Sequence, residues 1–305
     1  MKKILIILTV LIINLIIANP SYAIKIGLLT EVEQAGVGTN VNGRMIDVNT
    51  NKTVCTLDAM KGYILVPYKN EIAVKAGGHF YSLGTSAIVL RPDTEGYVST
   101  KGKWYRGKLM VKMSNGKLVV INDLTLEDYL KGVVPSEMPP SWEFEALKAQ
   151  AIAARSFALA NLGKQARFGY DLKDNTEDQA YGGASVETNK TNRAVEETTG
   201  LVLTYDMKII PAYYSASAGG MTNTNAWGGN LPYLRSVPSF DDGVKKNGHG
   251  VGMSQHGANN LAKEGYNAYQ ILQYFYPGRH PASPHFPRSI HCPRHSEVRS
   301  LQYRG

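Results

Sequence analysis

The sequence predicts an α+β protein, with a β-rich N-terminal half followed by a mixed α/β core that contains a central alanine-rich helix. From Ile24 to about Leu124, short apolar segments alternate with turn residues, as in antiparallel strands. After Leu124 the apolar residues recur every three or four positions, which is the helical period. Strands and helices therefore fall in separate parts of the chain, the arrangement that defines the α+β class.

The first 23 residues have the pattern of a secretory signal peptide. Two lysines precede an apolar run from Ile4 to Ala18, and Ser21 and Ala23 flank Tyr22 as a small-x-small site. We expect cleavage after Ala23 and a mature chain that works outside the cytoplasm, in the periplasm or the cell wall. The alternative is an uncleaved membrane anchor, although the run is shorter than the roughly 20 residues that a full span requires.

Composition narrows the class of partner. The 305 residues include 43% hydrophobic side chains, enough for a sizeable core, and the formal net charge is +8. Because no arginine-rich run with interleaved aromatic residues occurs, this charge favours an anionic polymer such as a cell wall over nucleic acid. The two cysteines, Cys55 and Cys292, are far apart in sequence and are predicted to be unpaired, although an oxidising compartment would permit a bridge.

In the β-rich half, turn residues separate the predicted strands. The clearest strands are Ile24–Leu28, Tyr63–Val66, Glu71–Val74, Lys108–Met113 and Lys117–Ile121. Pro67 marks a predicted turn between the second and third of these. The dipeptide Asn115-Gly116 predicts a hairpin between the last two.

The second half begins with two predicted helices. Thr125 is the expected N-cap of a short helix that runs into Gly132, and Ser141 is the expected N-cap of the central helix, which stops at Gly163. The stripe of this central helix is mostly alanine, so neighbouring helices can approach it closely. The further predicted elements are helices Asn189–Thr198, Ser254–Glu264 and Asn267–Tyr276 and strands Leu201–Tyr205 and Ile209–Ser215.

Glu137 is the main catalytic candidate, because it lies between Pro135 and Pro139 just ahead of the central helix. Prolines restrict their own φ and the residue before them, so a carboxylate placed this way is held in position, as a general acid must be. The alternative is a turn carboxylate that is satisfied by backbone N–H groups.

A second motif surrounds His249 between Gly248 and Ala258. Its glycines would let the main chain approach a ligand, and the helix that opens with Ser254 and Gln255 would offer free N–H donors. A single histidine in a glycine-rich turn is nevertheless more often structural than catalytic.

Together these motifs resemble the stage II sporulation protein D family of peptidoglycan lytic transglycosylases, which includes amidase-enhancer relatives. The resemblance covers well over half of the mature chain. The segments that carry it are Tyr105–Leu109, Leu126–Pro139, Ala146–Ser156, Gln179–Gly183, Thr191–Thr198, Tyr214–Gly220, the His249 motif and Tyr276–Gly278.

The resemblance implies cleavage of the β-1,4 bond between N-acetylmuramic acid and N-acetylglucosamine, with 1,6-anhydro ends as products and Glu137 as the single acid/base. Such an acid must be protonated before it reacts, and Met138, Trp142 and Phe144 are the apolar neighbours expected to raise its pKa. The nearby carboxylates are interpreted as helix-end charges without a catalytic role: Asp128, Glu143 and Glu145.

Supporting roles are divided between binding and structure. Arg155 would hold a sugar carboxylate or orient Glu137, or else form a structural ion pair. Candidates for hydrogen bonds to sugar hydroxyl and N-acetyl groups are Ser215, Ser217, His249, Ser254 and Gln255. Candidates for stacking on sugar faces, with core packing as the alternative, are Tyr181, Tyr214 and Trp227.

The sequence departs from the family pattern in two places. Some members bind zinc through cysteines and a histidine near the Gln-Ala-Tyr segment, whereas Asp174–Gln179 contains neither, so we expect no metal and no cofactor. The crossing from Asp242 to the His249 motif takes only residues 243–247, where the family has a longer segment, so a wall of the cleft is expected to be missing.

We therefore divide the chain into a signal peptide (1–23), a β-rich N-terminal region (24–124), a region resembling the family's catalytic part (125–278) and a disordered tail (279–305). The expected partners are peptidoglycan glycan strands, with a membrane contacted only through an uncleaved signal segment. The rival hypothesis is a non-catalytic wall-binding module that stimulates a cell-wall amidase.

Overall fold

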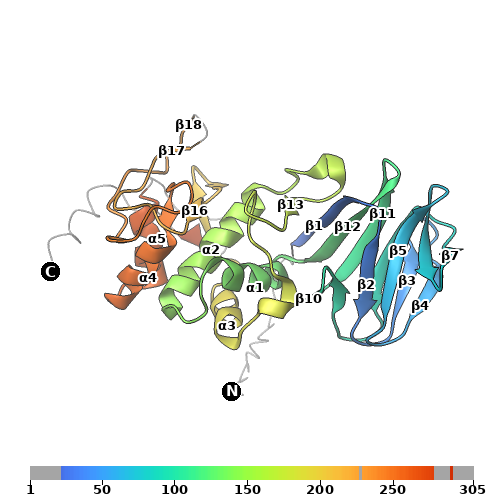
Figure 1. Ribbon diagram of the computed structural model, residues 1–305. Helices are drawn as coiled ribbons and strands as arrows, with labels where there is room; N and C mark the ends of the chain where they lie inside the picture. Colours follow the sequence, from blue (N-terminus) through green and yellow to red (C-terminus); the bar gives the residue numbers. More distant parts are fainter. Residues whose placement is uncertain (1–21, 227–228, 278–288, 291–305) are drawn as a thin grey trace, which may run out of the picture.

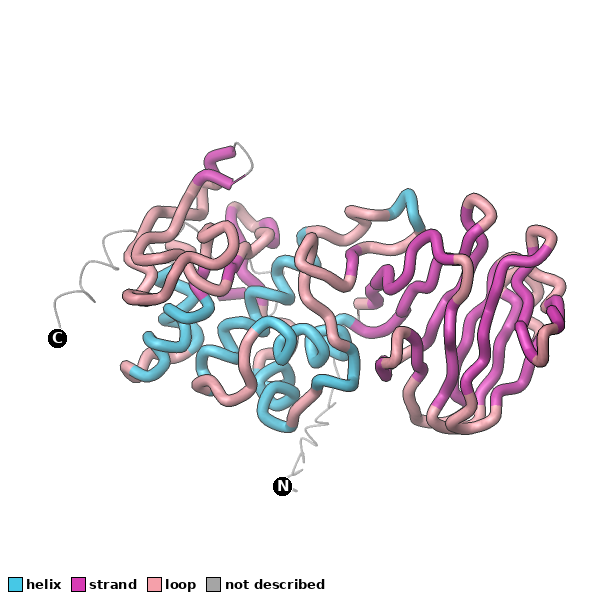
Figure 2. Tube along the Cα trace, viewed as in Figure 1, coloured by secondary structure: helices cyan, strands magenta, loops and turns pink. Residues whose placement is uncertain are grey.

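Strands from the N-terminal half form two sheets that pack face to face, and the helices gather beside them (Figures 1 and 2). The computed structural model describes residues 22–226, 229–277 and 289–290. The larger sheet has the order β13-β1-β12-β11-β8-β3-β4, and the smaller has the order β10-β9-β2-β5-β6-β7. We call residues 22–125 the β-sandwich and residues 126–277 the helical region. The chain is therefore α+β, as predicted.

The strands of the two sheets are short and are antiparallel to their neighbours, except for the parallel pair of β1 and β13. Their bounds are β1 Ala23–Val32, β2 Ala35–Thr39, β3 Gly43–Asp47, β4 Thr53–Leu57, β5 Gly62–Tyr68, β6 Glu71–Ala76, β7 His79–Ser82, β8 Ala87–Pro92, β9 Val98–Thr100, β10 Lys103–Tyr105, β11 Lys108–Ser114, β12 Lys117–Thr125 and β13 Leu172–Lys173.

Alternation along β12 shows how the sandwich is filled. Leu118 and Val120 point into the main core between the sheets, whereas Val119 and Ile121 point outward into a small separate cluster under Tyr170. Successive side chains of a strand face opposite sides, so one strand supplies both clusters. The outer cluster matters because it seats the loop that follows the central helix.

Two predicted turns have different outcomes. The Asn115-Gly116 hairpin is confirmed, since both residues have positive φ (50° and 76°) between β11 and β12. The predicted turn at Pro67 is wrong. Pro67 pairs with Ile72 inside the β5–β6 ladder, and the chain reverses at Lys69 and Asn70. The pairing of β5 with β2 ends at Leu65, so the missing N–H of Pro67 leaves no ladder partner unsatisfied on that side.

The helical region is built around α2, which Figure 1 shows among the other helices. The helices are α1 Leu126–Glu137, α2 Phe144–Ala160, α3 Asn189–Glu197, α4 Gln255–Lys263 and α5 Ala268–Phe275, with 3₁₀ turns η1 Ala166–Phe168 and η2 Gly183–Val186. The short strands are β14 Val202–Tyr205, β15 Lys208–Ile209, β16 Tyr214–Ser215, β17 Asn225–Ala226, β18 Gly229–Asn230, β19 Met253–Ser254 and β20 Ser289–Ile290. Every residue from Ala149 to Ala158 is buried, so α2 is enclosed on all sides and not along one stripe only.

Two predicted elements need correction, the central helix at both ends and the strand 209–215. The central helix begins at Phe144 after Glu143, whose N–H donates to Asn259 Oδ1 at 2.9 Å, so Ser141 is not its N-cap. It ends at Ala160, before Gly163. The predicted strand 209–215 is split into β15 and β16, because Pro211 between them has no N–H for a ladder.

Several predictions fall outside the described residues: the signal peptide up to residue 21, Trp227, Cys292 and most of the tail. Residues 289–290 of that tail form β20, which pairs in parallel with β14, so these two were wrongly assigned to disorder. In the described part of the chain, no helix has both the length and the apolar character needed to cross a membrane.

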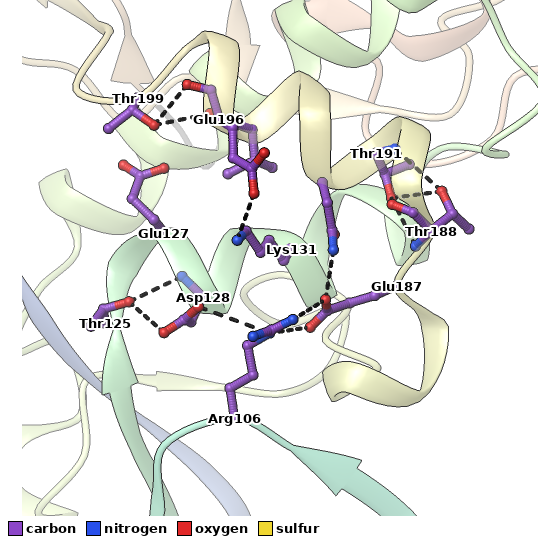
Figure 3. A network of polar contacts seen from close by, with 12 residues as sticks. Arg106, Thr125, Glu127, Asp128, Lys131, Glu187, Thr188, Thr191, Glu196 and Thr199 are labelled. Carbon is purple, nitrogen blue, oxygen red and sulfur yellow. Dashed lines mark hydrogen bonds and ion pairs between the residues drawn. The ribbon is translucent and has the colours of Figure 1, made fainter. Parts of the chain in front are cut away.

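A polar network fixes α1 against α3 and the β-sandwich (Figure 3). Arg106 forms a bidentate pair with Glu187, with Nε–Oε1 and Nη2–Oε2 distances of 2.7 and 2.8 Å. Lys131 of α1 pairs with Glu196 of α3 at 2.9 Å. The two-pronged arginine–carboxylate pair orients the segment before α3 on the β-sandwich, and Arg106 Nε also lies 3.9 Å from Asp128 Oδ1 of α1.

Candidate functional site

Glu137 is the last residue of α1, and not part of a loop as predicted. The helix continues through Pro135 and ends because Met138, the residue before Pro139, takes an extended conformation with φ −127° and ψ 139°. The second proline therefore ends the helix directly after the carboxylate. Glu137 is held by a helix terminus and not by a rigid turn.

The carboxyl group of Glu137 accepts hydrogen bonds from three separate parts of the chain. Its Oε1 accepts from the backbone N–H of Ala180 at 2.7 Å, and its Oε2 accepts from Gln255 Nε2 at 3.4 Å. The hydroxyl of Tyr214 also hydrogen-bonds this carboxyl group. All of these partners are donors, so they stabilise the ionised form.

Burial opposes these donors. Desolvation is the largest influence on the carboxyl group and raises the pKa of Glu137 above its ordinary value, while the bonds from Ala180, Gln255 and Tyr214 limit the rise. Of the three predicted apolar neighbours, Met138 is buried. Trp142 packs edge-on against His256, and the Arg193 guanidinium lies 4.3 Å from the Phe144 ring centre.

A chain of buried polar groups leads to Tyr214. Tyr129 donates to Gln179 Oε1 at 3.3 Å, and Gln179 Nε2 donates to the Tyr214 hydroxyl at 2.7 Å. Because Tyr214 accepts from Gln179, its own hydrogen is directed to Glu137. Gln179 had no predicted role beyond its place in the segment Gln179–Gly183. It lies outside the predicted helices and strands, so no apolar periodicity marked it as a buried residue.

A short parallel pairing brings the remaining partners together. Tyr214 and Ser215 of β16 pair with Met253 and Ser254 of β19, so Tyr214 lies beside the start of α4. Gln255, the first residue of α4, is buried and also lies 3.4 Å from Gln150 Oε1 of α2. Glu137, Tyr214 and Gln255 thus meet, and the two residues predicted to contact sugar hydrogen-bond the carboxyl group of Glu137.

A cavity of ≈ 310 Å³ adjoins this group, with Tyr214 in its wall. The other lining residues are Phe157, Asn161, Lys164, Thr176, Glu177, Asp178, Tyr213 and His249. The cavity is about the size of the smallest ligand pockets, which begin near 300 Å³. Asp178 is a second carboxylate in this wall, but it pairs with Lys164 and accepts from the Lys173 N–H at 2.7 Å.

His249 has a structural place in the wall of this cavity. Its Nδ1 accepts the N–H of Val251 at 2.9 Å, and the ring also hydrogen-bonds the main chain of Tyr214. Burial lowers the pKa of His249, so the neutral ring is favoured. With both nitrogens engaged by the main chain, the imidazole shapes the cavity.

Two glycines of this motif are required for close packing within the protein. A Cβ on Gly252 would lie 2.1 Å from the Tyr213 carbonyl oxygen, and one on Gly257 would lie 1.8 Å from that of Ser239. The N-terminal donors of α4 are not free either. Gly257 N–H donates to Ser254 Oγ at 3.1 Å, and His256 N–H donates to Ala216 O at 3.0 Å.

The predicted serines hold loops together. Ser215 Oγ accepts from Gly250 N–H at 3.1 Å, and Ser217 Oγ donates to Lys245 O at 2.7 Å, which closes the short 243–247 crossing. Ser254 Oγ donates to Asp241 Oδ2 at 2.7 Å. These contacts occupy all three hydroxyl groups within the protein.

Asp241 is a buried hub that the sequence analysis missed. Burial would raise its pKa, but hydrogen bonds from Ser239, Gly220, Ser254 and Ala218 outweigh burial and lower the pKa to about 2. The carboxylate thereby ties the 218–220 loop to the N-cap of α4. The only local indication was the Ser-x-Asp sequence of residues 239–241, and this pattern is common in turns, so it does not mark a buried carboxylate.

Two predicted residues have contacts that support the structural alternative. Arg155 is 1% exposed and binds Glu127 through Nε and Nη2 at 2.8 and 2.7 Å, so the structural ion pair is the alternative that the geometry supports. Glu127 lies ten residues before Glu137, about 15 Å along the helix. Tyr181 is buried, packs on Tyr129 and Tyr105, and donates to Asn122 Oδ1 at 2.8 Å, which supports core packing.

In the ranges 22–226, 229–277 and 289–290, no three side chains of His, Cys, Asp or Glu are grouped so that they could hold a metal ion.

Comparison with known proteins places these residues in a family context. The family model described as Stage II sporulation protein matches residues 114–205. Stage II sporulation protein D of Bacillus subtilis is 30% identical over 327 residues, covering 75% of this chain and 93% of that protein. An uncharacterized protein of Brachyspira hyodysenteriae is 34% identical over 196 residues, covering 63% and 49% of the two chains. The amidase enhancer of Bacillus subtilis is 47% identical over 107 residues, covering 34% and 14%.

The chain thus spans about half the length of the Brachyspira protein and a smaller share of the amidase enhancer.

Proposed function

Because this chain belongs to the stage II sporulation protein D family, we propose that it is a lytic transglycosylase of the bacterial cell wall with Glu137 as its single acid/base. The observation that carries the proposal is the half-buried Glu137 carboxyl group, which receives three donors and adjoins a cavity through Tyr214. Burial favours the protonated acid, and the donors favour the carboxylate that forms when the proton leaves.

In the proposed reaction, Glu137 first gives its proton to the glycosidic oxygen as the bond from that oxygen to C1 of the muramic acid breaks. The Ala180 N–H, the Gln255 amide and the Tyr214 hydroxyl stabilise the carboxylate that remains. The carboxylate then takes the proton of the muramic acid's C6 hydroxyl group, while the oxygen of that hydroxyl group bonds to C1. The products are a free sugar end and a 1,6-anhydro ring, and Glu137 is protonated again.

A one-carboxylate reaction suits this site better than hydrolysis with two carboxylates. Glycoside hydrolases need a second carboxylate that is free to act as base or nucleophile. Asp178, the candidate in the cavity wall, is already engaged by Lys164 and the Lys173 N–H. The substrate's own hydroxyl group therefore replaces the missing nucleophile.

The alternative is a non-catalytic protein that binds the wall and stimulates an N-acetylmuramoyl-L-alanine amidase. It is favoured by the 47% identity with the amidase enhancer over 107 residues. Both functions place the mature chain outside the cytoplasm, in agreement with the signal-peptide pattern of residues 1–23.

The test is to incubate purified glycan strands and intact wall with the full chain and to count anhydro-muramic ends by mass spectrometry. Glu137→Gln should lower their formation at least about 100-fold, because it removes the only proton donor. Glu143→Gln is the matched control, since Glu143 is an exposed carboxylate just after the site. Wild-type rates in Glu137→Gln would refute the proposal. Stimulation of an amidase without any anhydro ends would support the alternative.

A further inference from the structure

A second cavity lies on the outer face of the larger sheet, where the loop after α2 crosses the β-sandwich. Its volume is ≈ 220 Å³. The lining residues are Thr30, Glu31, Ser114, Asn115, Val119, Phe168, Tyr170 and Lys173. The cavity therefore combines two aromatic rings with several short polar side chains, the composition that is typical of small-ligand sites.

The aromatic wall has a defined support. Tyr170 lies against Gly27 of β1, where a Cβ would come within 2.8 Å of its ring, and it packs on Val119 and Ile121. Phe168 stacks on Tyr170, with the ring centres 5.9 Å apart and the ring planes 18° from parallel. Phe168 is nevertheless 40% exposed. Because the ring stacks on Tyr170 and the Arg167 guanidinium also lies over it, the exposed edge of Phe168 is the apolar surface that it offers to a sugar.

Cations surround this wall. The Arg167 guanidinium lies 4.5 Å from the Phe168 ring centre, and Lys173 lines the cavity. Lys112 Nζ lies beside Gly169, where a Cβ would be 2.4 Å from it. Lys173 is paired with Glu177 and Glu31 also lines the cavity, so Arg167 and Lys112 at its edge are the cations that would match a sugar carboxylate.

The two cavities are neighbours. Lys173 lines the second cavity, Glu177 lines the cavity beside Tyr214, and these two side chains form an ion pair. The same loop, residues 161–178, supplies walls to both. A polymer that lies in the first cavity would therefore reach the second across a single exposed ion pair.

We propose that the cavity formed by Phe168, Tyr170 and Lys173 is a distal subsite for a carboxylate-bearing aminosugar of a glycan strand whose cleaved bond lies at Glu137. The inference rests on the proposed function and adds to it a dependence on chain length. Short glycans fill only the cavity beside Tyr214. Longer glycans also contact Phe168 and the cations around it.

The test measures the affinity of the full chain for peptide-free muramic acid glycans of two and of four disaccharide units, by calorimetry in a Glu137→Gln background. Phe168→Ala should weaken binding of the longer glycan roughly tenfold, with the loss confined to that glycan. Leu162→Ala is the matched control. It removes another apolar side chain of the same loop that is also 40% exposed but does not line this cavity, and it should leave both affinities unchanged.

A second variant tests the sugar class. Arg167→Gln should weaken binding of the longer muramic acid glycan but not of a neutral chito-oligosaccharide of equal length. Equal affinities of Phe168→Ala and Leu162→Ala for the longer glycan would overturn the subsite, even if the wild-type chain forms anhydro ends. Formation of no anhydro ends by the wild type, together with a Phe168-dependent preference for longer glycans, would overturn the proposed reaction and leave the subsite standing.

Discussion

The β-sandwich and the helical region differ in what they bury. Among the described residues, five buried polar or charged residues lie in 22–125 and fifteen in 126–277. Buried polar groups require specific partners, whereas apolar groups require only shape and volume. The candidate site therefore belongs to the part of the molecule whose interior depends on paired groups.

The two regions also differ in charge. Residues 22–125 contain 13 Lys and Arg against 8 Asp and Glu, whereas residues 126–277 contain 13 against 16. The basic balance of the described chain is thus located in the β-sandwich, next to an acidic region that carries Glu137. An anionic polymer would be attracted to the first and would reach the second where the two meet.

The largest expected contrast between the regions concerns glycine. Gly257→Ala should lower the free energy of unfolding by about 3 kcal/mol or more, because the new Cβ would lie 1.8 Å from the Ser239 carbonyl oxygen. Gly62→Ala in β5 should change it by less than about 1 kcal/mol, since that Cβ meets nothing within 4 Å. Urea unfolding measures both. Similar losses would show that the packing contrast is not real.

The next contrast concerns ion pairs. Glu127→Ala leaves the buried guanidinium of Arg155 without its counter-charge and should cost about 3 kcal/mol. Asp93→Ala in the β-sandwich removes the partner of Arg44 from an exposed pair and should cost less than about 1 kcal/mol. Urea midpoints of the two variants give the comparison. A loss for Asp93→Ala as large as that for Glu127→Ala would contradict it.

Asp241 should make the stability of the helical region sensitive to acid. Its pKa is lowered from 3.8 to about 2, so the carboxylate adds stability that is present above about pH 4 and is lost as the pH falls through 2. The contribution is about 2 kcal/mol at 1.36 kcal/mol per pH unit. Asp241→Asn should be less stable at pH 6 and should lose less between pH 4 and 2. Parallel pH profiles of variant and wild type would refute this role.

The smallest expected effect has the opposite sign. Burial raises the pKa of Glu137 above 4.5, so its contribution to stability is fully present below that pH and is lost as the pH rises through the raised value. Glu137→Gln removes a buried charge and should therefore unfold at higher urea than wild type at pH 8, with a smaller difference at pH 4. Equal pH dependence would mean that Glu137 is solvated like a surface carboxylate.

The sequence predicted the α+β class, the Asn115-Gly116 hairpin and the central helix, because each depends on local period or on one turn residue. It also identified Glu137, Tyr214 and Gln255, which the structure brings together. The enclosure of α2 on all sides was missed, because an alanine-rich sequence is compatible both with a helix that buries one face and with a helix that is buried all round. The extent of α1 was missed, because the expected short helix ran into Gly132 whereas the observed helix continues through Pro135 to Glu137.

The partners of the site could not be read from local pattern. Gln179 and Asp241 act through bonds to segments far from them in sequence, such as Tyr129 to Gln179 and Ser254 to Asp241. The packing role of glycines in the His249 motif was missed, because the sequence does not show which backbone atoms lie against a glycine in the folded protein. Roles of this kind require knowing which strands pair, and β16 and β19 are only two residues each.

The pairing of β16 with β19 has a consequence for biosynthesis. Glu137 and Gln255 are separated by 118 positions, so a growing polypeptide presents the acid long before the amide that caps it. The carboxyl group therefore gains its last donor only once α4 lies beside α2, where Gln255 is also 3.4 Å from Gln150 Oε1.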